Sequence, residues 1–479
     1  MNWPNPHQPF TANLSLREVA IIGALAVVAF HLAYEVRSCA FVIWIFLFGV
    51  AQLARARSPR LAFYPGLVIG LAIYAPQAGF FWNIFGAAAI ALWLVLAFWL
   101  GIFALTARLV WQRWNPMAAS LLVPVVWAGI EYFRSELYYL RFTWLNAGYA
   151  FVEFPRIFSS TRLGVYGVGF VLMLTACALW RARARTALRL SYGFLAALAL
   201  ATNFFGRATT PAWERVSAIQ VAGLSLGDSS ESELLKELDR TIQIHPDTEL
   251  ILLNEYAFVT PPPEAIKHWC RAHKRHLVAG GKDFISENVF FNTAFVIDDH
   301  GEIVFRQAKS VPVQFFDDGL PARQQQLWNS PWGKIGICIC YDLSYRRVTD
   351  RLIRLGAQAL LVPTNDELHW GRHEHELHAR VARTRAAEFG VPIFRVGSCG
   401  IPQLVDAGGQ VQAAAVFSSE PRIITGELRL APSGICPLDT WLAPAASALT
   451  ALLLIWFCGE AIRAWRLRRA VQFSKVAPV

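Results

Sequence analysis

Eight apolar segments, each near the length of a membrane-spanning helix, constrain this 479-residue chain more than any other feature of its sequence. A helix that crosses the bilayer core needs about 20 mostly apolar residues. The composition agrees, because 55% of the residues are hydrophobic and only 16% are charged, whereas soluble domains carry about 25% charged residues. We therefore predict a polytopic α-helical membrane domain with spans at about 17–35, 38–54, 61–83, 86–107, 117–133, 164–180, 190–206 and 441–462.

Arginine clusters follow every second predicted span. Short loops rich in Lys and Arg stay in the cytoplasm, so the clusters and both termini are predicted on the cytoplasmic side. Residues 207–440 and a shorter arm at 134–163 then face the opposite side. These clusters explain much of the net charge of +10, and we expect no nucleic-acid partner. They comprise Arg55, Arg57 and Arg60; Arg108 and Arg113; Arg181, Arg183, Arg185 and Arg189; and Arg463, Arg466, Arg468 and Arg469.

Between about residues 214 and 430, short β-type runs alternate with polar runs of helical period. This alternation favours a mixed sheet covered by helices. Runs 292–298 and 302–308 flank a DDHG turn and predict a hairpin, and a second hairpin is expected around 406–409. The other predicted strands are 215–222, 249–255, 276–281, 334–340, 357–364 and 392–398, and the predicted helices are 231–244, 262–274, 346–355 and 373–389.

Three residues at the ends of predicted strands have the chemistry of a nucleophilic site: Glu255, Lys309 and Cys340. Each alone has an ordinary explanation, as a solvated strand end or a buried small side chain. Together the three residues have complementary roles, because a thiol needs a base to become a thiolate. A partly buried carboxylate can be that base, and a cation can stabilise the oxyanion that forms on the attacked carbonyl.

The cysteines and histidines show no metal-binding pattern. The eight cysteines are scattered without a CxxC pair, so we expect no disulfide framework. Leu377 stands where an HExxH motif would place its second histidine. We therefore expect no metal, and we interpret the histidines as one helix face with His378 directed to the core. That cluster comprises His369, His373, His375 and His378.

The order Glu255, Lys309 and Cys340-Tyr341-Asp342 resembles the carbon–nitrogen hydrolase (nitrilase) superfamily. Segment 364–400 is similar to the part of that superfamily that follows the nucleophile. Segments FTWLNAGYAF (142–151) and GVYGVGF (164–170) resemble the bacterial apolipoprotein N-acyltransferase family, as does the eight-span layout. The matching positions after the nucleophile are Asn365, Asp366, His378 and the run from Ala382 to Glu388.

The resemblance implies an α/β nitrilase-like αββα sandwich inserted before the last span. Its implied boundaries are a membrane domain at 1–206, a catalytic domain at 214–430, an eighth span at 441–462 and a cytoplasmic tail at 463–479. The protein would lie in the bacterial inner membrane with its catalytic domain in the periplasm. A monomer without a cofactor is expected.

The resemblance also implies a reaction. A phospholipid would donate a fatty acyl chain to Cys340 as a thioester, and the N-terminal amine of a diacylglyceryl-modified lipoprotein would accept it. Glu255 would be the general base and Lys309 the oxyanion-stabilising cation. The backbone N–H of Tyr341 would be a second oxyanion donor, with Asp317 and Asp342 as supporting acids.

The sequence departs from the family at several positions. Asp317 and Asp342 stand where the family has Glu, and Asn254 stands where it has Pro. The tryptophan expected in the first loop of the α/β region is absent from 223–233. Each Asp keeps the charge but is one methylene shorter, and misplacement of about 1 Å is costly at a catalytic site.

These departures leave two further hypotheses open. One is a membrane-bound amidase or an acyltransferase with a different amine acceptor. The other is a membrane scaffold with a decayed nitrilase domain. Cys338 is the alternative nucleophile, and Phe315-Phe316 could serve either for packing or as an apolar lid that admits an acyl chain.

Overall fold

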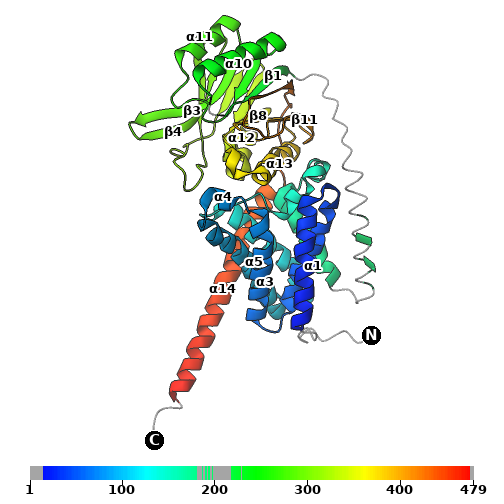
Figure 1. Ribbon diagram of the computed structural model, residues 1–479. Helices are drawn as coiled ribbons and strands as arrows, with labels where there is room; N and C mark the ends of the chain where they lie inside the picture. Colours follow the sequence, from blue (N-terminus) through cyan, green and yellow to red (C-terminus); the bar gives the residue numbers. More distant parts are fainter. Residues whose placement is uncertain are drawn as a thin grey trace.

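A helical part and an α/β part lie one above the other in the computed structural model, and the long helix α14 (Asp439–Ser474) descends from the junction between them (Figure 1). The structure describes residues 14–180, 217–227 and 229–474, with a few single positions between 186 and 197.

The helices of the lower part begin at sequence signals that satisfy their free N–H groups. The Ser15 side chain accepts from the backbone N–H of Glu18 in a capping box, and proline stands at the start of α3 and of α6. The elements are α1 (Leu16–Glu35), η1 (Arg37–Val42), α2 (Ile43–Gln52), η2 (Leu53–Arg55), α3 (Pro59–Gln77), α4 (Phe81–Phe85), α5 (Ala88–Arg113), α6 (Pro116–Tyr132), η3 (Phe133–Leu137), η4 (Ala147–Glu153), α7 (Arg156–Thr161) and α8 (Gly164–Trp180).

Most of the predicted spans coincide with these helices. Within the described ranges, five helical stretches are long and apolar enough to cross a membrane, and they match the first, second, fourth, fifth and eighth predicted spans. The third prediction was too long, because α3 ends at Gln77 and the short α4 follows; Pro76 and Gly79 disfavour a continuous helix there. The sixth is a shorter apolar helix, and the predicted span 190–206 lies almost entirely outside the described residues.

Two six-stranded sheets form the upper part. In each, three neighbouring strands run parallel and antiparallel partners extend the sheet on either side. One has the order β12 (Arg422–Arg429), β1 (Ala218–Ser225), β2 (Leu250–Leu253), β3 (His276–Ser286), β4 (Val289–Ile297), β5 (Ile303–Ala308), and the other β11 (Val411–Ala414), β10 (Gln403–Val405), β9 (Ile393–Gly397), β8 (Ala359–Thr364), β7 (Gly333–Ile337), β6 (Leu327–Ser330).

Helices cover both outer faces of the sheet pair, which gives the αββα sandwich (Figure 1). The central strands are buried on both faces, so β2 reads as an unbroken apolar run. The predicted strands and helices are confirmed with small shifts at their ends, whereas β6 and β12 were missed. The covering helices are α10 (Glu231–Ile244), α11 (Glu264–His273), α12 (Arg346–Leu355) and α13 (Arg372–Phe389).

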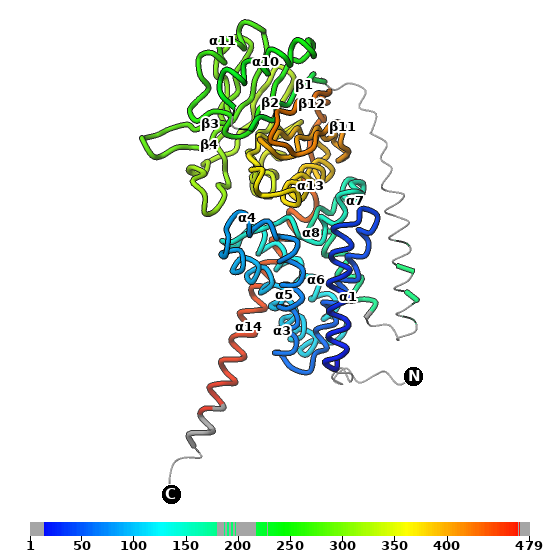
Figure 2. Tube along the Cα trace, in the orientation of Figure 1, coloured from blue at the N-terminus to red at the C-terminus, as the bar shows by residue number. Residues whose placement is uncertain are grey.

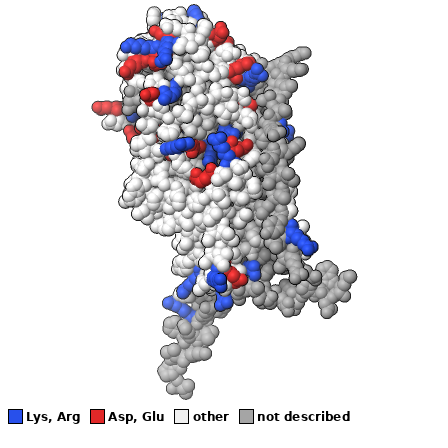
Figure 3. Space-filling model, turned by 45° about the vertical axis from the view of Figure 1, so that its right-hand side comes forward, with Lys and Arg blue, Asp and Glu red and all other residues white. Residues whose placement is uncertain are grey.

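The helices α12 and α13 face the membrane helices and share one apolar core with them. Figure 2 shows α7 and α8 directly beneath α13, and both contact it. In Figure 3 an uncharged belt crosses the lower part, with charged side chains above and below it, as expected for a surface that meets lipid.

A buried charge network joins the two parts at this interface. Arg346 on α12 forms ion pairs with Glu388 on α13 and with Asp439 at the start of α14. Asp439 also accepts from the backbone N–H of Tyr166 on α8, at 2.9 Å. Glu136, in η3 after α6, accepts from the backbone N–H of Arg346 at 3.1 Å. Elements from both parts therefore meet in one cluster of charges.

Candidate active site

The ends of the parallel strands bring the predicted catalytic residues to one edge of the sandwich. Glu255 follows β2, and Cys340 follows β7 at the start of η5 (Cys340–Ser344). Lys309 directly follows β5, whose neighbour β4 pairs with β3. Gly280 on β3 permits this approach, because a Cβ there would lie 2.6 Å from the Cα of Glu255.

Glu255 and Lys309 form a buried ion pair, with 2.8 Å between Oε1 and Nζ, and each residue is 1% exposed. The amide of Asn292 donates to the same Oε1 at 2.6 Å, and the backbone N–H of Asn365 donates to Oε2 at 2.7 Å. Burial raises the pKa of Glu255 above its ordinary value, although Lys309 opposes that shift. The carboxyl is therefore held in place and suited to accept a proton.

A second carboxylate contacts Lys309, and it is Asp318 rather than the predicted Asp317. The Oδ2 atom of Asp318 lies 2.7 Å from Lys309 Nζ, and Oδ1 accepts from Tyr256 OH at 2.7 Å. Asp317 is exposed at the mouth of the cavity. The two aspartates are adjacent in VPVQFFDDG, and the conformation of the loop decides which of them turns inward. The sequence therefore did not indicate which one contacts Lys309.

Charge and burial oppose each other at Lys309. Burial disfavours its charged form, but Glu255, Cys340 and Asp318 raise the pKa of Lys309 well above its ordinary value. The lysine is thus a permanent cation, able to stabilise negative charge that develops beside it.

Cys340 occupies a sharp turn with a backbone φ of 50°, in the left-handed region that few side chains adopt. Its thiol donates to the carbonyl of Asn365 at 3.8 Å. Burial raises the pKa of Cys340 well above that of a free cysteine, so the resting group is a thiol that needs a base. Cys338 is fully buried in the apolar core and is not among the residues that line the cavity.

The two residues after Cys340 have different surroundings. Tyr341 lines the cavity, and its hydroxyl donates to the carbonyl of Arg141 at 3.2 Å. Asp342 is fully buried and accepts from the backbone N–H groups of Ser310 at 3.0 Å and Val311 at 2.7 Å. Asp342 therefore joins the turn that carries Cys340 to the segment that follows Lys309.

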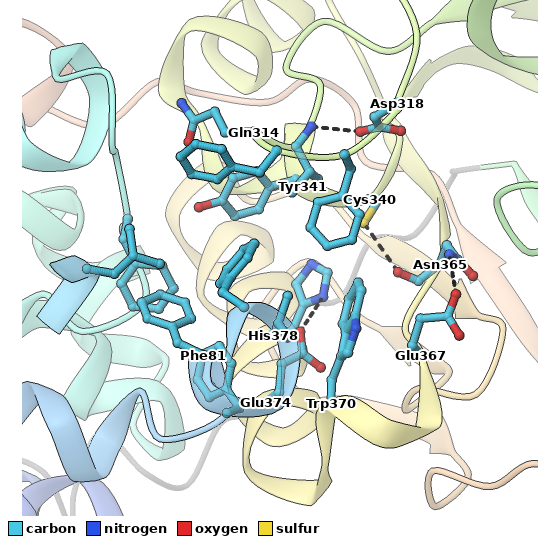
Figure 4. A pocket seen from close by; sticks show the side chains of 18 of the residues that line it. Phe81, Gln314, Asp318, Cys340, Tyr341, Asn365, Glu367, Trp370, Glu374 and His378 are labelled. Atoms are coloured by element: carbon cyan, nitrogen blue, oxygen red, sulfur yellow. Dashed lines mark hydrogen bonds and ion pairs between the residues drawn. The ribbon is translucent and has the colours of Figure 1, made fainter. Parts of the chain in front are cut away.

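A cavity of about 310 Å³ connects these residues to the membrane helices (Figure 4). The wall beside Cys340 is polar, whereas the opposite wall consists of apolar side chains from α4 and α5. Phe315 and Phe316 lie at its mouth, 65% and 45% exposed, and both contact Phe85 of α4 with ring centroids 5.9 Å apart. The apolar wall comprises Phe81, Ile84, Phe85, Leu92, Val95 and Leu96.

Phe315 and Phe316 thus cover the cavity and do not pack in the core. Of the two interpretations that the sequence left open, the geometry favours the apolar lid.

His378 is buried, as predicted, and it also lines the cavity, which the sequence pattern did not indicate. Its Nδ1 lies 2.8 Å from Asp366 Oδ1, and Asp366 Oδ2 accepts from Arg395 at 2.5 Å. Among the residues that the structure describes, two groups could offer a metal three ligand atoms within 4.8 Å of one another: Cys340, Asp366 and His378, and Asp366, Glu374 and His375. Both depend on Asp366, whose two oxygens already bind His378 and Arg395, so the residues present form an ion-pair network.

The two facing sheets form a nitrilase-like carbon–nitrogen hydrolase fold, and residues 257–431 match the carbon-nitrogen hydrolase family. Residues 22–178 match the apolipoprotein N-acyltransferase N-terminal domain. The chain thus combines both matches in one polypeptide, and it is similar to apolipoprotein N-acyltransferases over most of its length.

Several proteins match this chain over most of their own length. The apolipoprotein N-acyltransferase of Geobacter metallireducens is 24% identical over 81% of this chain and 85% of its own. That of Azotobacter vinelandii is 27% identical over 84% and 87%. A crystal structure of a carbon-nitrogen hydrolase from Helicobacter pylori covers 44% of this chain and 89% of its own, with 18% identity and a TM-score of 0.40.

Proposed function

We propose that this protein moves a fatty acyl chain from a membrane phospholipid, through a thioester on Cys340, to the N-terminal amine of a diacylglyceryl-modified lipoprotein. The names of its relatives support N-acylation of lipoproteins. The main support for the mechanism is the cavity, because Cys340 faces an apolar wall formed by α4 and α5 of the helical part. A hydrolase for small soluble amides has no use for such a wall.

In the first half-reaction, Glu255 accepts the proton of the Cys340 thiol while the sulfur attacks the ester carbonyl carbon of the phospholipid. Lys309 and the backbone N–H of Tyr341 stabilise the oxyanion that forms. The C–O bond then breaks, the proton on Glu255 passes to the leaving oxygen, and a lysophospholipid departs. The buried ion pair of Glu255 and Lys309 supports these roles.

The location of the substrates fits a catalytic domain, 214–430, held between membrane helices. Both substrates are anchored in lipid and would enter sideways beneath Phe315 and Phe316. We place the domain on the periplasmic side of the bacterial inner membrane, as the arginine clusters of the loops indicate. An amine must compete with water at the thioester, and a site closed by apolar side chains favours the amine.

Intact-mass measurement of the purified protein tests the proposal. Incubated with phosphatidylethanolamine–phosphatidylglycerol micelles, the unmodified chain should gain one hydroxylamine-sensitive fatty acyl group. Cys340→Ala should gain none, whereas Cys338→Ala should gain it normally. Acylation of Cys340→Ala, or no acylation of the unmodified chain, would contradict the thioester mechanism.

The acceptor is tested separately. A peptide with a diacylglyceryl-modified N-terminal cysteine should discharge the thioester and become N-acylated. If the thioester forms but only another amine discharges it, the alternative of a different acceptor holds.

A further inference from the structure

A second acid–base pair faces Cys340, and it is separate from the pair of Glu255 and Lys309. Asp366 follows β8, and His378 lies on α13. Figure 4 shows His378 among the side chains that line the cavity with Cys340. A ring nitrogen of His378, the sulfur of Cys340 and an oxygen of Asp366 all lie within 4.8 Å of one another. The mechanism proposed above uses neither His378 nor Asp366.

The hydrogen bonds of His378 define its tautomer. Asp366 Oδ1, at 2.8 Å from Nδ1, can only accept, so the proton of a neutral imidazole lies on Nδ1. Arg395 Nη2 is also 3.1 Å from Nδ1, but it donates to Asp366 Oδ2 over a shorter distance of 2.5 Å. The lone pair of the ring is therefore on Nε2.

The Nε2 atom is buried and has no hydrogen-bond partner within the described residues. The side chain is only 2% exposed, yet it lines the cavity that contains Cys340. A buried basic nitrogen without a partner is unfavourable unless a ligand supplies one. It therefore indicates a place for a donor group that enters with the substrate.

The ring is held in a fixed orientation. Trp144 of the arm stacks on His378, with ring centroids 4.7 Å apart and an interplanar angle of 19°. The indole N–H of Trp144 donates to Ser344 Oγ at 2.9 Å. A side chain that transfers a proton must be held in a fixed orientation, and these contacts hold the His378 ring.

The ring lies beside two buried carboxyl groups, those of Asp366 and Glu374. Despite its burial, the charges of Arg395 and His378 hold the pKa of Asp366 below its usual range, so Asp366 is a permanent anion. Glu374 lies 3.7 Å from Nδ1, and burial raises its pKa. Asp366 can thus stabilise an imidazolium. When the ring is neutral, Arg395 compensates the charge of Asp366.

We propose that His378, oriented by Asp366, is the general base that deprotonates the amine acceptor in the second half-reaction. This inference rests on the proposed function. The nitrogen lone pair of the neutral amine attacks the thioester carbonyl carbon, and His378 Nε2 takes a proton from that nitrogen as the N–C bond forms. The C–S bond then breaks, its electron pair goes to the sulfur of Cys340, and the proton on Nε2 passes to that sulfur.

The two half-reactions are measured separately to test this assignment. The variant His378→Asn keeps a group that can donate to Asp366 but lacks Nε2. Thioester formation from phospholipid micelles, followed by intact mass, should stay within about threefold of the unmodified rate. Single-turnover transfer to the diacylglyceryl peptide should fall by about 100-fold or more, the usual contribution of a general base.

Two controls separate catalysis from structure. His373→Asn changes a half-buried histidine on the same helix, which contacts Gln77 Oε1 at 3.2 Å and is not among the residues lining the cavity, and it should leave both rates unchanged. Added imidazole should partly restore transfer in His378→Ala, because the truncated side chain leaves room for it beside Asp366.

Three outcomes would overturn the inference. In the first, transfer by His378→Asn stays within about threefold of normal. In the second, both half-reactions fall by the same factor, which would make His378 a structural residue. In the third, imidazole fails to restore transfer in an alanine variant that still forms the thioester. If the unmodified protein forms no thioester, the proposed function fails first, and that result is distinct from these.

Discussion

Lys309 Nζ contacts two buried carboxylates, those of Glu255 and Asp318. The role of Asp318 can be tested by mutation. Asp318 accepts from Lys309, Tyr256 and Asn292, with distances of 2.7–2.8 Å. Asp318→Asn removes its charge and leaves a buried donor without its acceptor, a loss of about 1–3 kcal/mol. We expect the rate of thioester formation to fall by about 10- to 100-fold in a single-turnover assay.

The neighbouring aspartate provides the matched control. Asp317 is exposed, so Asp317→Asn should change the rate by less than about threefold. The reverse result, a large effect at Asp317 and none at Asp318, would favour the assignment made from sequence alone.

The carboxyl of Glu255 should set the acid limb of the pH profile. Burial raises the pKa of Glu255 above 4.5, with Lys309 opposing the shift. A general base works only when it is ionised, so thioester formation should rise with pH through this raised pKa and be lost below it. A rate that stays constant down to about pH 4.5 would contradict this role.

Asp342 is the group most easily confused with Glu255 in that profile, because burial raises its pKa to about 6. Asp342→Asn separates the two contributions. If Glu255 is responsible, the acid limb of the variant keeps its midpoint.

At the scale of elements, Asp342 joins the turn after β7 to the segment after β5. Its oxygens accept from three backbone N–H groups, those of Ser310, Val311 and Ile339. The family's glutamate would be one methylene longer, and this site is fully buried. We expect Asp342→Glu to destabilise the protein by about 1–3 kcal/mol, because overpacking forces its neighbours apart.

Thermal unfolding of the detergent-solubilised protein measures this effect. Asp247→Glu, the same change at an exposed position, should leave the midpoint nearly unchanged. A midpoint for Asp342→Glu equal to that of the unmodified protein would show that the turn accommodates the longer side chain.

Elements with a clear period could be predicted from sequence, and short or irregular ones could not. α10 and α12 were predicted with their observed ends, because polar and apolar residues alternate with helical period between clear strand runs. β6 has only four residues, and β12 is interrupted by Gly426, so neither gave a strand pattern. The site residues at strand ends were predictable, but Asp318 depended on the conformation of a loop.

At the scale of the whole molecule, the sequence predicted two parts but not the surface between them. The cavity unites side chains more than 250 positions apart, from Phe81 to Trp370, and local patterns carry no information about such contacts. His378 shows this limit best. Its helix was predicted, but its place beside Cys340 follows from how α13 packs against the arm that carries Trp144.

The charge network around Arg346 has a consequence for how the protein loses its structure. If the two parts separated, the ion pair between Arg346 and Asp439 and the hydrogen bond from the backbone of Arg346 to Glu136 would break, whereas Arg346 and Glu388 would stay together in the α/β part. Breaking one partner out of such a buried pair costs about 3–5 kcal/mol. The membrane helices and the catalytic layers should therefore melt as a single cooperative unit, with one calorimetric transition that Arg346→Met shifts to lower temperature. Two separate transitions would contradict this linkage. The αββα sandwich should therefore depend on the membrane helices for part of its stability.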